Sequence, residues 1–319
     1  MTVPRVVLGR LLTLVLSLAG ASVLIFLVVQ ALPGDLAQVM LGERATPAQI
    51  EALRERLGLN RPWVVRYLDW VGDMVRGDLG TSALSGLRVT DLVAGPIRVT
   101  GWLVLWSTLG SILVALPLGM WSALRRRHWD GFAVNALSQF GMAVPAFLAG
   151  ILLVLVVAVR WGWLPANGYV PLARDPGEWA RHLVLPVVSL VLVQGALLVR
   201  YVRSAFVEVL TEDHITTARS VGWTKLAALW RHGMRQAGLS LVTVLGLQVA
   251  SLFVGAIVVE NVFVLPGLGS MVLRAVVQRD FIVVQSVVML LVVAVLVVNT
   301  VVDLLQAVLD PRIRAKEQR

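Results

Sequence analysis

Six stretches of this chain are long and apolar enough to cross a lipid bilayer, because a spanning helix needs about 20 mostly apolar residues. Each stretch lies between charged residues and carries almost no charge of its own; they are Leu11–Gly34, Val99–Leu124, Gly131–Val159, His182–Val199, Gln236–Val259 and Phe281–Val302. Hydrophobic residues make up 58% of the chain and charged residues 15%, against about 25% charged in soluble domains. The sequence therefore predicts an all-α polytopic membrane protein with six transmembrane helices.

The first apolar stretch also resembles a signal peptide, since Arg5 and Arg10 precede an apolar run that contains Ala19-Gly20-Ala21. The run continues through residues 23–29, which makes it too long for the apolar region of an ordinary signal peptide. We therefore expect this stretch to be retained as a membrane helix, so that residues 1–34 form the N-terminus and first span.

The orientation follows from the basic residues in short loops, which favour the cytoplasmic side. Six spans place both termini on one side, together with the loops that contain Arg125-Arg126-Arg127 and residues 200–235, and this side carries fifteen basic residues. The opposite short loops carry five. We expect both termini to be cytoplasmic. The net charge of +9 is then explained by the insertion of the chain into the membrane. The basic segments lack the interleaved aromatic residues that stack on nucleic acid bases.

The first extracytoplasmic loop, residues 35–98, is predicted to be a small helical insertion. Thr46-Pro47-Ala48-Gln49 forms a capping box with proline at the first helical position, and Gly58 is a natural stop. A second helix is expected from about Pro62 to Gly77. The two helices either lie on the outer membrane surface or form a cap that a substrate-delivery protein contacts.

The cytoplasmic segment 208–235 is predicted to hold a short helix, His214–Ser220, which Asp213 caps and Gly222 ends with a left-handed turn. Thr224 is expected to cap a second helix that continues into the fifth span. Such a short helix at the membrane base suits the transmission of force from a soluble partner. It is equally consistent with a solvated amphipathic connector. The spans after the outer loop, residues 99–310, would form a five-helix core, and residues 311–319 a cytoplasmic tail.

Catalytic chemistry is not indicated. The four histidines, His128, His182, His214 and His232, fall in loops or at span ends, and none stands at a metal-ligand spacing. The chain contains no G-x-x-x-x-G-K-[ST] phosphate loop and no cysteine. We expect no catalytic residue, no metal site and no cofactor bound by this chain.

Neutral polar residues do occur within the spans, and such residues either join helices by hydrogen bonds or line a wet passage. They include Ser107, Ser111, Asn135, Ser138, Gln139, Ser189, Gln194, Gln248, Ser251 and Asn299. Amide and hydroxyl groups would suit the backbone of a peptide. The candidates for lining a translocation path are Ser138, Gln139, Gln194, Gln248 and Ser251.

The cytoplasmic segment resembles the loop of binding-protein-dependent ABC importer permeases, which carries E-A-A, three residues and then glycine. Thr216-Thr217-Ala218 stands at the E-A-A position and Gly222 at the glycine, whereas residues 232–235 depart from the I-x-L-P that follows in the general pattern. The dipeptide, oligopeptide and nickel branch of this family departs in the same way, with T-A-R and R-H. Thr217-Ala218-Arg219 and Arg231-His232 match these two motifs.

Further motifs of the same branch follow in order along the chain. They are Leu32-Pro33-Gly34-Asp35, Arg76-Gly77-Asp78-Leu79-Gly80, Gly162-Trp163-Leu164-Pro165, Val259-Glu260-Asn261-Val262-Phe263, Pro266-Gly267-Leu268-Gly269, Arg279-Asp280-Phe281 and Leu309-Asp310-Pro311-Arg312. The long first outer loop resembles that of the permease subunit with the larger insertion.

The resemblance implies a transport subunit that forms half of a path for di- or oligopeptides by alternating access. The loop helix would be a coupling helix that docks on a cytoplasmic ATPase, with Asp213, Thr216, Thr217, Ala218, Arg219 and Gly222 at that site. The implied partners are a second, usually different permease chain, two ABC ATPase subunits that hold ATP and Mg²⁺, and an extracytoplasmic solute-binding protein.

Two alternatives remain. Import of nickel, a metal chelate or another small solute is consistent with the same branch of the family. A membrane scaffold or receptor without a transport path would use the polar span residues only for contacts between helices.

Overall fold

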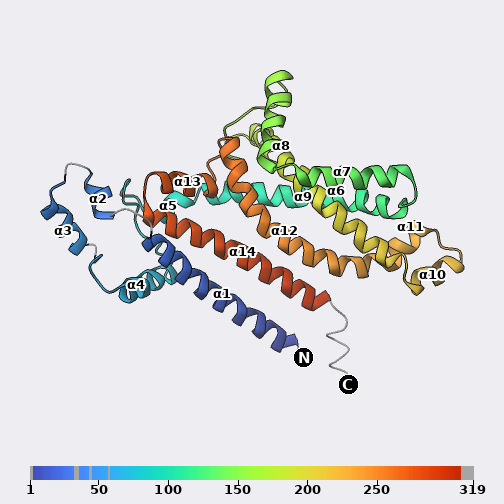
Figure 1. The fold of residues 1–319 in the computed structure, drawn as a ribbon, viewed down its shortest axis with the longest axis horizontal. Helices are drawn as coiled ribbons and strands as arrows, with labels where there is room; N and C mark the ends of the chain where they lie inside the picture. The colour runs from blue at the N-terminus through green and yellow to red at the C-terminus, as the bar shows by residue number, and fades with distance from the viewer. Residues whose placement is uncertain (1–2, 32–35, 43–44, 57, 310–319) are drawn as a thin grey trace. The chain divides into compact units, whose positions relative to one another are not determined.

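The computed structural model describes residues 3–31, 36–42, 45–56 and 58–309 of the chain (Figure 1). Within these ranges the protein is helical and holds no strand, only an isolated bridge between Thr81 and Arg88. The all-α prediction is confirmed. The motifs at residues 32–35 and 309–312 and the predicted tail at 311–319 lie wholly or mostly outside the described residues.

The helices are α1 (Val3–Ala31), α2 (Leu36–Leu41), α3 (Pro47–Arg56), α4 (Trp63–Val75), α5 (Val89–Val93), α6 (Pro96–Leu124), α7 (Trp129–Ala143), α8 (Ala146–Leu153), η1 (Val154–Arg160), α9 (Pro176–Val209), α10 (Asp213–Ser220), α11 (Lys225–Ala228), η2 (Leu229–Gly233), α12 (Met234–Val262), α13 (Leu268–Val277) and α14 (Phe281–Leu309).

Five of the described helical segments are long and apolar enough to cross a membrane, and a bent pair raises the number to six if it counts as one span. The bent pair corresponds to the third predicted span, Gly131–Val159, which is not one straight helix. Its two parts meet at 99°. The break lies at Val144, which is extended (φ −85°, ψ 120°) before Pro145, because proline disfavours a helical residue before it and cannot donate a helical hydrogen bond.

The fourth span is longer than its apolar core of residues 182–199. Helix α9 has 34 residues, which corresponds to about 51 Å and exceeds the ~30 Å hydrocarbon layer. Arg200 and Arg203 therefore lie within the helix, and the guanidinium carbon of Arg200 lies 5.0 Å from the ring centroid of Tyr201. Charged residues thus mark the edge of the apolar core and not the end of the helix.

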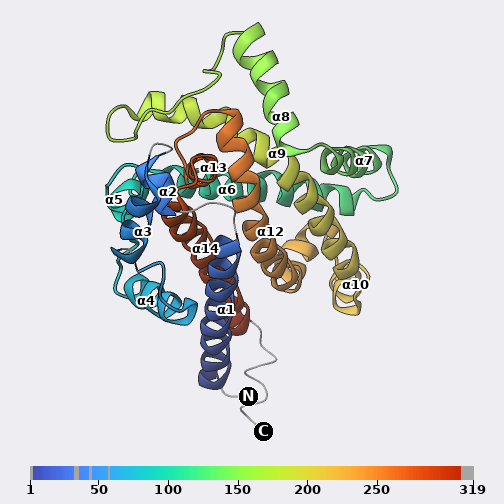
Figure 2. The same ribbon diagram turned by 60° about the vertical axis from the view of Figure 1, so that its left-hand side comes forward.

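The chain divides into two compact units. The first contains residues 1–12, 101–265 and 297–319, and α9 packs in it against α7, α8 and α12 (Figures 1 and 2). Glycines permit these close contacts: a Cβ on Gly141 of α7 would lie 2.9 Å from the Cβ of Ala196. Near one end of this unit, the Arg10 guanidinium and the Asp303 carboxylate form an ion pair at 2.8 Å, which accounts for Asp303 without a catalytic role.

The second unit contains residues 13–100 and 266–296. The capping box is present, since the N–H of Thr46 donates to Gln49 Oε1 at 2.9 Å and the N–H of Gln49 donates to Thr46 Oγ1 at 3.4 Å. Gly58 and Gly77 adopt left-handed conformations with φ of 65° and 85°, and they follow α3 and α4 as predicted. The outer loop is therefore folded into helices.

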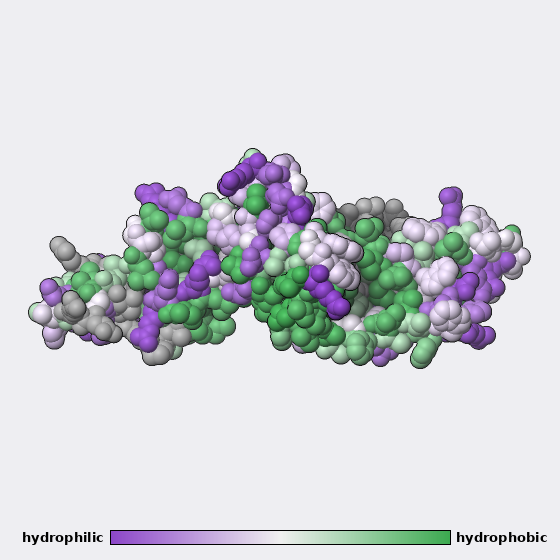
Figure 3. All heavy atoms as spheres, turned by 90° about the horizontal axis from the view of Figure 1, so that it is seen from above, coloured by the Kyte–Doolittle hydropathy of each residue, from purple (hydrophilic) through white to green (hydrophobic). Residues whose placement is uncertain are grey.

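Large apolar side chains on the span helices face outward. Leu24, Leu113 and Leu247 are 63%, 75% and 70% exposed, and Figure 3 shows broad hydrophobic areas on the face that it draws. A soluble protein rarely exposes contiguous apolar patches of this extent. This surface matches the hydrocarbon of a bilayer.

Candidate functional site

The loop between α9 and α12 begins with a turn that leads into the short helix α10. Leu210 is the C-cap residue of α9, and Glu212 occupies the N-cap position of α10 without a side-chain cap hydrogen bond. The prediction that Asp213 caps the helix is wrong, because Asp213 is already the first helical residue. Glu212 instead accepts a hydrogen bond at its carboxylate from Gln236 Nε2 of α12 at 3.3 Å.

Helix α10 has one buried face and one exposed face. Ile215 and Ala218 are 0% and 8% exposed and belong to a buried cluster with Phe206 of α9 and Leu229 of η2. The remaining predicted coupling residues lie on the exposed face: Asp213, Thr216, Thr217 and Arg219. The hydroxyls of Thr216 and Thr217 donate to backbone carbonyls four residues earlier, so the helix satisfies them itself.

Gly222 ends this helix in the left-handed conformation that the sequence predicted, with φ of 96°. The N–H of Gly222 donates to the carbonyl of Arg219 at 3.1 Å, and the N–H of Trp223 donates to the carbonyl of Ala218 at 3.2 Å. These two bonds form a Schellman motif, which satisfies carbonyls that a helix end otherwise leaves open. The motif turns the chain back toward α11.

The base of α12 packs tightly against the end of α9. Thr224 Oγ1 accepts a hydrogen bond from the N–H of Ala227 at 3.2 Å, which confirms Thr224 as the cap of the second helix. A Cβ on Gly233 of η2 would lie 2.8 Å from Val209 Cγ1 at the end of α9. Helix α10 therefore rests on a base to which both α9 and α12 contribute.

Apolar side chains next to α10 add to its exposed face. Val221 and Trp223 are 73% and 41% exposed, and Trp230 is 54% exposed. Trp223, Trp230 and Arg231 line a shallow, open depression with Ala227. The sequence prediction did not include Val221 and Trp223, although two bulky apolar residues on either side of a turn glycine in a charged loop are a signal for a contact surface.

Three of the predicted path residues come together between α9 and α12. Gln194 Nε2 donates to Ser251 Oγ at 3.0 Å, and Gln248 Nε2 donates to the carbonyl oxygen of Gln194 at 3.0 Å. Ser251 Oγ donates to the carbonyl oxygen of Gln248 at 2.8 Å. Gln248 is 5% exposed, whereas Ser251 is exposed. This polar network has one buried end and one accessible end.

The two other predicted path residues lie on α7 and take no part in the polar network's hydrogen bonds. Ser138 is 5% exposed and donates to the carbonyl of Asn135 at 2.8 Å within its own helix. Gln139 lies on the exposed side of α7. Helix α7 does pack against α9, so all five residues belong to one group of contacting helices.

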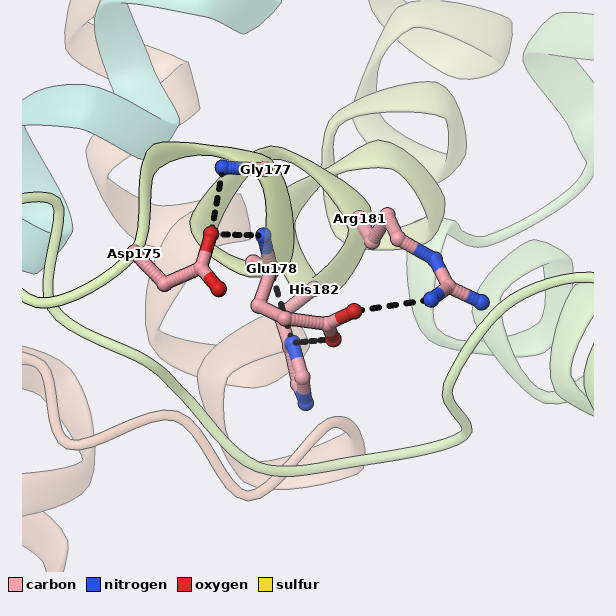
Figure 4. Close-up of polar contacts among 5 residues, drawn as sticks. All are labelled: Asp175, Gly177, Glu178, Arg181 and His182. Atoms are coloured by element: carbon pink, nitrogen blue, oxygen red, sulfur yellow. Dashed lines mark hydrogen bonds and ion pairs between the residues drawn. The ribbon is translucent and has the colours of Figure 1, made fainter.

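The opposite end of α9 is fixed by its own cap, which Figure 4 shows. Asp175 Oδ1 accepts from the N–H groups of Gly177 and Glu178 at 2.9 and 3.1 Å. Glu178 pairs with Arg181 at 2.7 Å, and His182 Nδ1 lies 2.8 Å from the Glu178 carbonyl oxygen. His182 is thus held by its own helix. Across the described part of the chain, no three His, Asp or Glu side chains cluster as metal ligands.

Apolar spans, a polar network between two of them and a short loop helix at their common base define an integral membrane protein with helices joined by polar contacts. The family model described as "Binding-protein-dependent transport system inner membrane component" matches residues 115–315. The N-terminal model of the same transport systems matches residues 3–84. The chain belongs to this family of inner-membrane permeases of binding-protein-dependent ABC importers, and it is a multi-pass membrane subunit that is not itself catalytic.

Curated relatives cover almost the whole chain. The oligopeptide transport system permease protein AppB of Bacillus subtilis is 36% identical over 93% of this chain and 95% of its own length. A probable peptide ABC transporter permease protein, y4tP, of Sinorhizobium fredii is 33% identical over 97% and 98%. The glutathione transport system permease protein GsiC of Escherichia coli K12 is 36% identical over 97% and 99%.

Proposed function

We propose that this chain forms half of the translocation path of an ATP-driven importer for di- or oligopeptides. The observation that carries the proposal is the network of Gln194, Gln248 and Ser251 between α9 and α12. These groups are neutral donors and acceptors, which match the amide groups of a peptide backbone. The similarity to permeases named for oligopeptide, peptide and glutathione transport supports the same substrate class.

Helix α10 is the proposed docking element for a cytoplasmic ATPase. The same two helices that meet at its base also carry the network: Gln194 lies 15 residues before Val209, and Gln248 lies 14 residues after Met234, or about 21 to 23 Å along the helices. A displacement of α10 would therefore move both sides of the network together. Rigid-body movement of this kind changes access to a passage between this chain and a second permease chain.

The complete transporter in this proposal contains a second permease chain, two ATPase subunits and a solute-binding protein on the outer side. The ATPase subunits hold ATP and Mg²⁺, and the hydrolysis of ATP supplies the free energy of transport. This chain contributes the path and the α10 contact.

Both termini are proposed to be cytoplasmic, with the first loop, residues 35–98, outside. The chain has no native cysteine, so single cysteines report topology directly. Ser85 and Ser220 are both exposed. In intact cells, a membrane-impermeant maleimide should label Ser85→Cys and should label Ser220→Cys only after permeabilisation. The reverse pattern would overturn the orientation.

The function is tested by the ATPase activity of the purified complex in lipid, with its binding protein present. Dipeptides, longer peptides, glutathione and Ni²⁺ are added separately. We expect peptides to stimulate hydrolysis several-fold and Ni²⁺ to leave it unchanged. Stimulation by Ni²⁺ alone would replace the peptide assignment with metal import, and failure to recruit an ATPase would favour a scaffold without transport.

A further inference from the structure

Helix α4 of the outer loop packs against the side of the membrane span α1 (Figure 1). The hydroxyls of Tyr67 and Ser22 form a hydrogen bond at 2.8 Å. The ring of Phe26 lies 5.5 Å from Tyr67 and 6.2 Å from Trp70, centroid to centroid. Ser22 and Phe26 are only 4% and 6% exposed. The contact is a specific polar and aromatic junction between the two helices.

This junction lies within the membrane span α1, before the C-terminal end of the span at Ala31. Phe26 and Ser22 precede Ala31 by five and nine residues, which corresponds to about 7 and 13 Å along the helix. The apolar span Val7–Ala31 has 25 residues and is about 37 Å long, some 7 Å more than the hydrocarbon layer. Even if the extra length of α1 projects entirely out of the hydrocarbon layer on the side of the outer loop, Ser22 still lies about 6 Å inside that layer.

The side chains of α4 divide into three sectors around its axis, at about 100° per residue. Tyr67 and Trp70 form the sector that contacts α1. Val64, Leu68 and Val75 form an exposed apolar sector, with exposed fractions of 45%, 60% and 82%. The third sector is charged and contains Arg66, Asp69 and Asp73, with Arg76 on the same side at the C-cap. The charged sector lies nearly opposite the exposed apolar sector.

We propose that α4 is an interfacial helix, inserted into the outer leaflet of the membrane with its exposed apolar sector in the acyl chains and its charged sector toward the headgroups and water. The partner of this surface is lipid. In the same stretch of α1 as the junction, Leu24, Leu27 and Val28 are 63%, 48% and 54% exposed, so this part of the span also presents apolar side chains outward. A helix lying in the interface buries its apolar face about 5–10 Å into the boundary between headgroups and acyl chains, and the junction at Ser22 lies about 6 Å or more inside the hydrocarbon.

Because the junction pins α4 to Ser22, it fixes the depth of the outer loop relative to the bilayer. The loop then does not stand as a free cap above the membrane. Its helix α4 is part of the membrane-embedded body of the protein.

The test uses spin labels on single cysteines in the complete transporter, reconstituted in lipid nanodiscs. Leu68→Cys reports the apolar sector, Asp69→Cys the charged sector, and Leu24→Cys a lipid-facing site on α1. Collisions with oxygen, which concentrates in lipid, are compared with collisions with a water-soluble nickel chelate. We expect the label at residue 68 to collide several-fold more with oxygen than with the chelate, as at residue 24, and the label at residue 69 to show the reverse.

Equal exposure of residues 68 and 69 to the nickel chelate would place α4 in water and overturn the proposal. Shielding of residue 68 from both reagents would show that a protein covers this sector, and it would likewise overturn the assignment to lipid. The readout does not depend on transport, so it stands apart from the test of the proposed function.

Discussion

The backbone N–H of Trp223 donates a hydrogen bond to the carbonyl oxygen of Ala218 at 3.2 Å, and this bond requires the left-handed conformation of Gly222 between them. No atom lies within 4 Å of a Cβ placed on Gly222. A side chain here is therefore limited by the backbone conformation and not by a clash. The end of α10 depends on the one residue type that adopts φ of 96° at little cost.

Replacing Gly222 with valine should lower the rate of peptide uptake at least tenfold. The protein should remain in the membrane. A β-branched residue resists a left-handed conformation, so the turn after α10 would rearrange. Uptake and membrane content are measured together in cells. Gly222→Asn is the matched control, because asparagine tolerates this conformation, and it should retain most of the uptake. Normal uptake by the valine variant would sink the assignment of α10 as the coupling helix.

Replacing Gln248 with leucine should lower peptide uptake about tenfold and leave the complex assembled. The substitution removes the donor to the Gln194 carbonyl and one amide from the proposed path. The loss in stability should be modest, about 0.6–2 kcal/mol for a hydrogen bond between membrane helices. The control is Leu247→Ala at the adjacent, 70% exposed position. Equal uptake by both variants would show that Gln248 only joins helices.

Replacing Asp280 with asparagine should loosen the outer segment 77–88. Asp280 is 3% exposed, and its carboxylate accepts from Ser82 Oγ at 2.5 Å and from the N–H groups of Ala83 and Val283 at 3.3 and 3.4 Å. Hydrogen bonds to a charged group contribute about 1.5–3 kcal/mol. Trypsin should cleave after Arg88 several-fold faster in this variant.

The control for Asp280 is Asp91→Asn, which changes an exposed carboxylate in α5, just after this segment, and should leave cleavage unaltered. If both variants are cleaved at the wild-type rate, the Asp280 contacts do not hold the segment.

Gly119→Ala should separate α6 from α9 and lower the melting temperature of the detergent-solubilised protein. The added Cβ would lie 2.5 Å from Val202 Cγ1 and 2.9 Å from the carbonyl oxygen of Val199, and overpacking costs about 1–3 kcal/mol. Gly101→Ala, on the same helix with no atom within 4 Å of the new Cβ, should be neutral. An unchanged melting temperature for Gly119→Ala would contradict this packing.

The elements that were predicted correctly from the sequence depend on local residue patterns. Apolar length located the spans, and the capping box at Thr46, the cap at Thr224 and the turn at Gly222 each follow from one or two residues. The start of α10 was misplaced by one residue, because an acidic residue satisfies both the cap position and the first helical turn. Glu212 and Asp213 are therefore hard to distinguish by type.

Features that depend on tertiary structure were not predicted. Apolar composition does not show where a helix axis changes direction. The 99° break in the third span was therefore not predicted, although Pro145 was a local signal for it. The bond between Ser82 and Asp280 joins residues 198 positions apart, and no periodicity connects them. The sequence identified Gln194, Gln248 and Ser251 as polar residues in spans, but only the packing of α9 against α12 brings them together.

ATP-driven accumulation of a labelled peptide in proteoliposomes tests the central claim most directly. The vesicles contain the complete complex with this chain, either wild-type or Gly222→Val, and the binding protein is added on its proposed side. We predict ATP-dependent uptake by the wild-type complex and loss of uptake by the Gly222→Val complex. Failure of the wild-type complex to accumulate any di- or oligopeptide, while its ATPase remains active, would contradict the proposed function.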